Sequence, residues 1–62
     1  MNKDWTVWVG GTEVNDYLLT QDKAKDLAME YIGGGYEIED VQIENLSDDK
    51  TYQLINNKWR EV

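Results

Sequence analysis

Residues 20–35 read TQDKAKDLAMEYIGGG, and this stretch decides the fold. Its apolar residues recur every three or four positions, the spacing that places side chains on one side of an α-helix. The members of this apolar stripe are Ala24, Leu27, Ala28, Tyr31 and Ile32. Thr20 can accept a hydrogen bond from the first helical turn, and the glycines at 33–35 end the helix. The pattern predicts a half-buried helix over residues 21–32 that draws its stability from packing.

The segment before the helix predicts a β-hairpin. Residues 5–9, WTVWV, are aromatic and β-branched, as is typical of a strand. The pair Gly10-Gly11 predicts a two-residue turn, because both positions of a type I′ turn need positive φ. With this turn, Trp8 lies opposite Glu13 in the second strand, which Asn15-Asp16 interrupts with a bulge or turn. The residues expected beneath the helix are Trp5, Val7, Val9 and Val14, whereas Thr6, Trp8 and Glu13 are expected on the other face.

The segment after the helix predicts further strands. Residues 36–40 form an acidic connection, and residues 41–46, VQIENL, alternate with Val41 and Ile43 inward. Turn residues follow at 47–50. The remaining segments are a strand at 51–55, a tight turn at Asn56-Asn57 and a last short strand at 58–62.

A terminal helix over residues 47–62 is the competing interpretation of the C-terminal part. Ser47 could cap such a helix, and its apolar residues lie near helical spacing. They are Tyr52, Ile55, Trp59 and Val62. The hairpin is preferred, because residues 51–55 favour a strand and the Asn56-Asn57 pair would fall in the middle of the helix.

These elements predict one α+β domain over residues 1–62. A single helix packs on one face of a mostly antiparallel sheet of four or five strands, with the chain order β-β-α-β-β. A right-handed crossover from the second strand to the third leaves room for the first strand between them, which gives the strand order 2-1-3-4. The opposite face of the sheet would be open and would carry Trp8.

Composition restricts the possible functions. The chain has 62 residues, enough for one domain whose core rarely yields more than about 3–5 kcal/mol. It has no cysteine and no histidine, so thiolate and imidazole chemistry are absent. Thirteen acidic and six basic residues give a net charge of −7, which disfavours nucleic acid and anionic membranes and favours a basic partner. No long apolar run precedes Trp5, so we expect no signal peptide and a cytoplasmic location.

The sequence also contains no pattern typical of a catalytic, cofactor or metal site. Carboxylates gather in the second half of the chain, at Glu37, Glu39, Asp40, Glu44, Asp48 and Asp49. Such oxygen ligands suit Ca²⁺ or Mg²⁺, but the EF-hand spacing is missing, and a solvated acidic edge is expected. The glycines at 33–35 follow a helix, whereas phosphate binds at helix N-termini. We therefore predict no enzymatic activity, no cofactor and no metal.

The aromatic residues indicate a binding surface. The chain has three Trp and four Tyr but no Phe. Trp and Tyr are enriched at interface hot spots, because each combines a large apolar body with a polar group. The residues predicted to bind a protein are Trp8, Glu13, Tyr17 and Tyr52. Direct nucleic-acid binding is not expected, and self-association as a homodimer is the simplest form of the predicted interaction.

One resemblance adds an expectation about origin. Residues 5–20, WTVWVGGTEVNDYLLT, precede an A-x-x-L-A-x-x-Y helix, the glycines and the pattern G-Y-x-x-x-D-V-x-I-E. Over about residues 5–44 this pattern resembles small uncharacterised proteins encoded by tailed phages of marine cyanobacteria. The resemblance implies a phage origin and action inside a bacterial host cell. It brings no known activity, cofactor or site residue.

The leading hypothesis is therefore a small acidic phage accessory protein. It would bind a host or phage protein, or itself, through the open sheet face around Trp8. The alternative is an acidic DNA mimic that inhibits a DNA-binding host protein. A mimic needs carboxylates spaced along a stripe like phosphates, and the interspersed lysines weaken that hypothesis.

Overall fold

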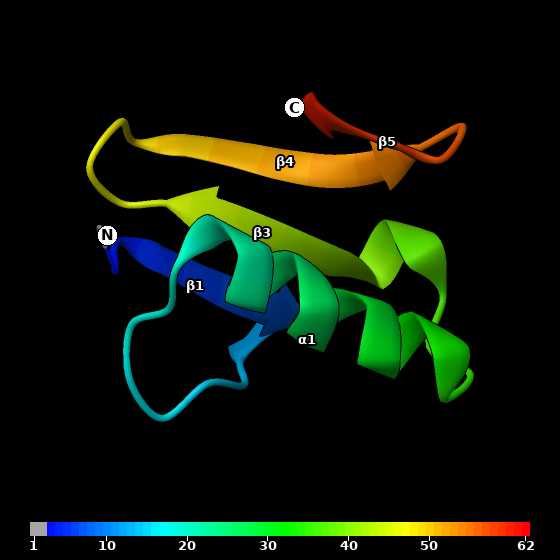
Figure 1. Cartoon of the computed structure of the whole chain (residues 1–62). Helices are drawn as coiled ribbons and strands as arrows, with labels where there is room; N and C mark the ends of the chain where they lie inside the picture. The colour runs from blue at the N-terminus through cyan, green and yellow to red at the C-terminus, as the bar shows by residue number, and fades with distance from the viewer. Residues whose placement is uncertain (1–2) are drawn as a thin grey trace.

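The computed structural model describes residues 3–62 and shows one helix against a five-stranded antiparallel sheet (Figure 1). The elements are β1 (Trp5–Val9), β2 (Thr12–Glu13), α1 (Gln21–Gly33), a short 3-10 helix η1 (Ile38–Asp40), β3 (Val41–Asn45), β4 (Lys50–Ile55) and β5 (Lys58–Glu61). Their order in the sheet is β2-β1-β3-β4-β5. The predicted fold class is confirmed, and a fifth strand extends the predicted strand order.

Helix α1 begins and ends as the sequence predicts. The Thr20 hydroxyl accepts from the backbone N–H of Lys23 at 3.3 Å, which satisfies one donor of the first turn. At the other end the Gly34 N–H donates to the carbonyl of Glu30 at 3.0 Å. Gly35 then adopts φ 109°, a conformation that a residue with a Cβ rarely adopts, so the chain leaves the helix there.

Two tight turns fix the register of the outer strands. Gly10 and Gly11 have φ 58° and 82°, and β1 pairs with β2 so that Trp8 lies opposite Glu13, as predicted. Asn56 and Asn57 also have positive φ, at 53° and 66°, and join β4 to β5. Consecutive left-handed residues are incompatible with an α-helix, so the terminal helix considered for residues 47–62 does not form.

The core lies between α1 and the neighbouring strands β1 and β3 (Figure 1). Alternate residues of each strand point toward the helix, and the helix contributes two alanines whose small side chains allow a close approach. The buried cluster consists of Trp5, Val7, Val9, Ala24, Ala28, Val41 and Ile43. All of these positions are ones that the strand alternation and the helical stripe predict to be inward.

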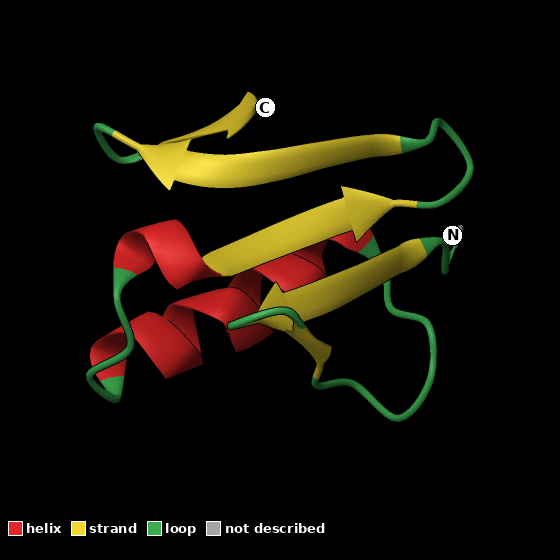
Figure 2. Cartoon of the chain, turned by 180° about the vertical axis from the view of Figure 1, so that it is seen from behind, coloured by secondary structure: helices red, strands yellow, loops and turns green. Residues whose placement is uncertain are grey.

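The β4–β5 hairpin extends past the part of the sheet that α1 covers (Figures 1 and 2). On the helix side of this hairpin Leu54 is buried, and Tyr52 and Trp59 are half-buried.

The remaining segments are the connections on either side of α1. Leu19 exchanges two backbone hydrogen bonds with Trp5, at 2.8 and 2.9 Å, and packs on the core, while Leu18 is exposed. Residues 38–40 of the predicted acidic connection form η1.

Candidate functional site

The sheet face opposite α1 is open over the described residues, as Figure 2 shows from behind. The register of the paired strands shows which side chains lie on this open face. Trp8 pairs with Gln42, Gln42 with Gln53, and Gln53 with Arg60, so these four residues form one row across the sheet. A second row contains Thr6, Glu44 and Thr51. The open face therefore presents one indole among amide, hydroxyl and charged side chains.

Trp8 is held in place on this face. Its indole N–H donates to Oε1 of Glu44 at 3.1 Å, across the β1–β3 pair. The ring is half-buried rather than covered, because α1 lies on the other side of the sheet. An indole whose polar group already has a partner presents a fixed apolar surface beside polar neighbours.

Glu13 lies beside Trp8 and takes part in a local network. Its carboxylate accepts a hydrogen bond from the hydroxyl of Thr6, which is only 1% exposed although it lies on the open face. Oδ1 of Asn15 also lies 2.8 Å from that hydroxyl and accepts from the backbone N–H of Val7 at 2.8 Å. The Asn15 amide nitrogen donates to the carbonyl of Tyr17 at 2.9 Å.

Asn15 therefore continues the β1–β2 ladder with its side chain, beyond the two residues of β2. The sequence predicts a bulge or turn at this position but not this role. The signal that could have predicted this role is a short amide side chain directly after a strand, because such a side chain can take the place of a backbone carbonyl as hydrogen-bond acceptor. The result is a corner of the chain that is hydrogen-bonded to the edge of β1.

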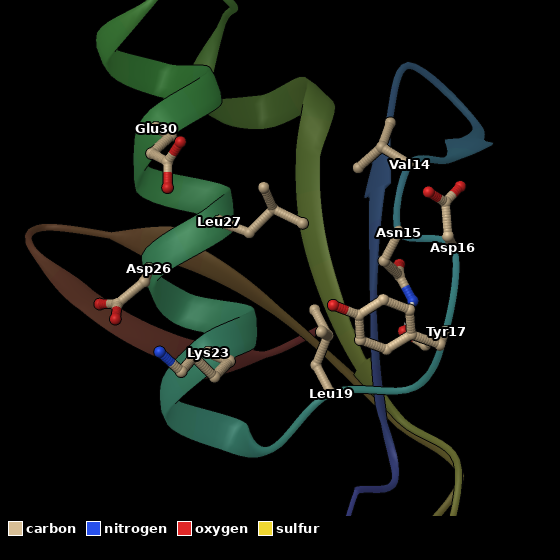
Figure 3. A pocket seen from close by; sticks show the side chains of 9 residues that line it. All are labelled: Val14, Asn15, Asp16, Tyr17, Leu19, Lys23, Asp26, Leu27 and Glu30. Atoms are coloured by element: carbon tan, nitrogen blue, oxygen red, sulfur yellow. Dashed lines mark hydrogen bonds between the residues drawn. The ribbon is translucent and has the colours of Figure 1, made fainter.

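Tyr17 lies on a different surface. It is 74% exposed in the loop between β2 and α1. Figure 3 shows it on one side of a groove of about 390 Å³, with α1 on the other side. The groove has an apolar floor and a charged rim, and it is lined by Val14, Asn15, Asp16, Tyr17, Leu19, Lys23, Asp26, Leu27 and Glu30.

Tyr52 does not belong to the open face. It pairs with Ile43, which pairs with Val7, so all three point to the helix side. Its ring centroid lies 5.6 Å from that of Trp5 at an interplanar angle of 35°. Tyr52, predicted with Trp8 as a protein-binding residue, therefore lies on the opposite face of the sheet, which corrects its assignment to the open face. Adjacent positions of a strand point to opposite faces, and the register of β4 against β3 decides which face each one takes.

The charges are distributed unevenly along the chain. Residues 50–62 carry three cationic side chains and one carboxylate, a net charge of +2, whereas residues 3–49 carry three cations and twelve carboxylates, a net of −9. The C-terminal hairpin is therefore locally basic. Among residues 3–62, the one ion pair within 4.0 Å joins Lys50 and Glu61, and both side chains are exposed, so it adds little stability.

The carboxylates do not form a continuous stripe. They are spread over α1, η1, the turn between β3 and β4, and both faces of the sheet. This arrangement gives no support to the DNA-mimic hypothesis, which needs a line of negative charges.

In the described part of the chain, no three Asp or Glu side chains gather as a group that could hold a metal ion. No helix within residues 3–62 is long and apolar enough to cross a membrane.

Comparison with known proteins finds no matching family model, curated protein or solved structure.

Proposed function

We propose that this chain is a small acidic protein-binding module that docks onto a partner protein through the open sheet face centred on Trp8. The observation that carries the proposal is the position of this indole. It lies on the face that no element of residues 3–62 covers, and its N–H is fixed by Glu44.

The chemistry of the face suits a reversible protein interface. Such interfaces combine an aromatic anchor with a polar surround that forms hydrogen bonds, rather than a continuous apolar patch. Trp8 supplies the anchor, and Gln42, Gln53 and Arg60 supply donors and acceptors in the same row. Because Glu44 and the Thr6–Glu13 contact already order the surface, binding would cost less side-chain entropy.

The partner would be a protein of a bacterial host or of the phage itself, or a second copy of the chain. The phage setting and the host cytoplasm rest on the resemblance of residues 5–44 to phage-encoded proteins. A binding role is favoured over catalysis, since the two carboxylates beside the indole, Glu13 and Glu44, already accept hydrogen bonds from Thr6 and Trp8. Within the part of the chain that the structure describes, the open face therefore offers no pair of free acids and bases that converge on one point.

The test compares two substitutions in a pull-down from host and infected-cell lysates, with sedimentation velocity of the pure proteins. Trp8→Thr keeps a strand-forming residue but removes the indole. Met29→Gln changes an exposed apolar side chain on α1, on the opposite side of the sheet, and serves as the control. We expect Trp8→Thr to lose the retained protein, or the self-associated species, by about tenfold or more, and Met29→Gln to keep it. Equal retention by the wild type and Trp8→Thr would contradict the proposal.

A further inference from the structure

Strand β5 forms one outer edge of the sheet, and one of its sides has no partner among the described residues (Figure 1). In antiparallel strands, alternate residues direct their backbone groups toward the same neighbour. Lys58 flanks the two-residue turn opposite Ile55, and the Val62 N–H donates to the carbonyl of Thr51 at 2.9 Å. It follows that Trp59 and Glu61 direct their N–H and C=O groups away from β4.

The other edge of the sheet offers much less. Strand β2 contains two residues, and Thr12 pairs with Val9 while the Val14 N–H donates to the carbonyl of Val7 at 3.0 Å. Only Glu13 is left facing outward in that segment. Asn15 then turns the chain away with its side-chain hydrogen bonds. Edge β5 is therefore the edge that can accept a further strand over several residues.

The side chains of β5 define what such a strand must carry. Lys58 and Arg60 point to the open face, because Arg60 shares the row of Gln53 and Trp8. Trp59 points to the helix side, where it packs half-buried against the core. An added strand also alternates its side chains between the two faces. It would meet two cations on one face. On the other face it would meet an indole and the Glu61 carboxylate, which already forms an ion pair with Lys50.

We infer that the β5 edge binds an extended peptide segment in which acidic and apolar residues alternate, so that the segment becomes a sixth strand. Backbone hydrogen bonds to Trp59 and Glu61 supply the affinity, and the two faces supply the selectivity. The net side-chain charge of +2 over residues 50–62 favours an acidic ligand at this end of a chain that is otherwise strongly negative. At about 0.15 M salt the screening length is roughly 8 Å, so the local charge dominates.

A second copy of the chain fits this edge poorly. In a two-fold antiparallel arrangement that places Trp59 opposite Glu61, Arg60 lies opposite Arg60 of the other copy. An arrangement that places Trp59 opposite Trp59 sets Lys58 against Arg60. Like charges directly opposite each other destabilise strand pairing, and edge cations of this kind prevent self-association.

The experiment titrates the ¹⁵N-labelled 62-residue chain with two synthetic peptides at about 0.15 M salt. The probes are acetyl-Glu-Val-Glu-Val-Glu-amide and its counterpart with Lys in place of Glu. We expect the acidic peptide to bind at least about tenfold more tightly. Binding should slow amide exchange at Trp59 and Glu61 and leave exchange at Arg60, whose N–H faces β4, nearly unchanged.

Two pairs of variants test the mechanism. Glu61→Pro removes an outward N–H without removing a bond to β4, and Glu61→Ala is the matched control that keeps this N–H. We expect the proline variant to lose about tenfold or more in affinity relative to the alanine variant. Combined Lys58→Glu and Arg60→Glu substitutions should reverse the preference between the two peptides. The Trp8→Thr variant, which tests the open face, should bind the acidic peptide as the wild type does.

Three results would overturn the inference. The first is equal binding of the acidic and basic peptides. The second is equal affinity of Glu61→Pro and Glu61→Ala. The third is protection of the Trp59 and Glu61 amides by self-association in the absence of peptide, which would assign the edge to a second copy.

Discussion

The two faces of this sheet are built by the same strands yet differ in their chemistry. On the face beneath α1, Val7, Val41 and Ile43 are fully buried. On the reverse face, their strand neighbours include Trp8 and Gln42, which are half-buried and not covered by any described element. We therefore expect the covered face to determine stability and the reverse face to determine binding. Substitutions beneath the helix should change the free energy of unfolding, whereas substitutions on the reverse should change association.

The largest effect on stability is expected at Ile43. Its side chain is completely buried between β3 and α1, so Ile43→Ala should leave a cavity and lower the free energy of unfolding by about 2–5 kcal/mol. A core of this size rarely yields more than about 3–5 kcal/mol, so the variant should be largely unfolded at 25 °C.

Urea denaturation followed by circular dichroism measures this loss. Ile43→Val, which removes one methylene, is the control and should cost about 0.5–1.5 kcal/mol. A loss below about 1 kcal/mol for the alanine variant would show that the covered face is not the main source of stability.

An intermediate effect is expected at Asn15, whose side chain is hydrogen-bonded to β1. Its side chain accepts from the Val7 N–H and lies against the buried Thr6 hydroxyl. Asn15→Ala leaves the Val7 N–H without its acceptor, while the Thr6 hydroxyl keeps its bond to Glu13, and should cost about 1–3 kcal/mol. Asp16→Ala, at the exposed neighbouring position, should change stability by no more than about 0.5 kcal/mol. If the two variants have the same free energy of unfolding in urea denaturation, the side chain of Asn15 does not stabilise strand β1.

Of the three positions Ile43, Asn15 and Trp8, the smallest effect on stability is expected at Trp8. The indole is half-buried, and its one hydrogen bond is to a side chain on the open face. Trp8→Thr should therefore lower the free energy of unfolding by about 1 kcal/mol or less. Urea denaturation of Trp8→Thr and Ile43→Ala under the same conditions measures the two losses in free energy of unfolding. A loss as large as that of Ile43→Ala would place the indole in the core and end the argument for a docking face.

Much of this fold follows from local patterns in the sequence. The Gly10-Gly11 and Asn56-Asn57 turns set the pairing of β1 with β2 and of β4 with β5, because two consecutive positive φ angles admit few alternatives. The helical stripe that contains Ala24 and Ala28 identifies the covered face. These features depend on residues close together in the sequence.

The features that sequence analysis misses depend on contacts between elements rather than on the pattern within one element. The face on which Tyr52 lies is set by the register of β4 against β3. The residues of the turn between these two strands do not determine that register. The burial of Thr6 depends on Asn15 and Glu13 converging on it from another segment. The uncovered hairpin depends on where α1 crosses the sheet.

The most direct test of the proposed docking face is site-specific photo-crosslinking from its centre. A photo-crosslinking amino acid at Gln42, the neighbour of Trp8 in the adjacent strand, is compared with the same amino acid at Met29, which is exposed on α1. Both proteins are irradiated in the lysate or at the concentration where association is observed. We expect a discrete crosslinked product from position 42 that disappears when Trp8→Thr is added, and none from position 29. A product from position 29 with none from position 42 would contradict the proposed docking face.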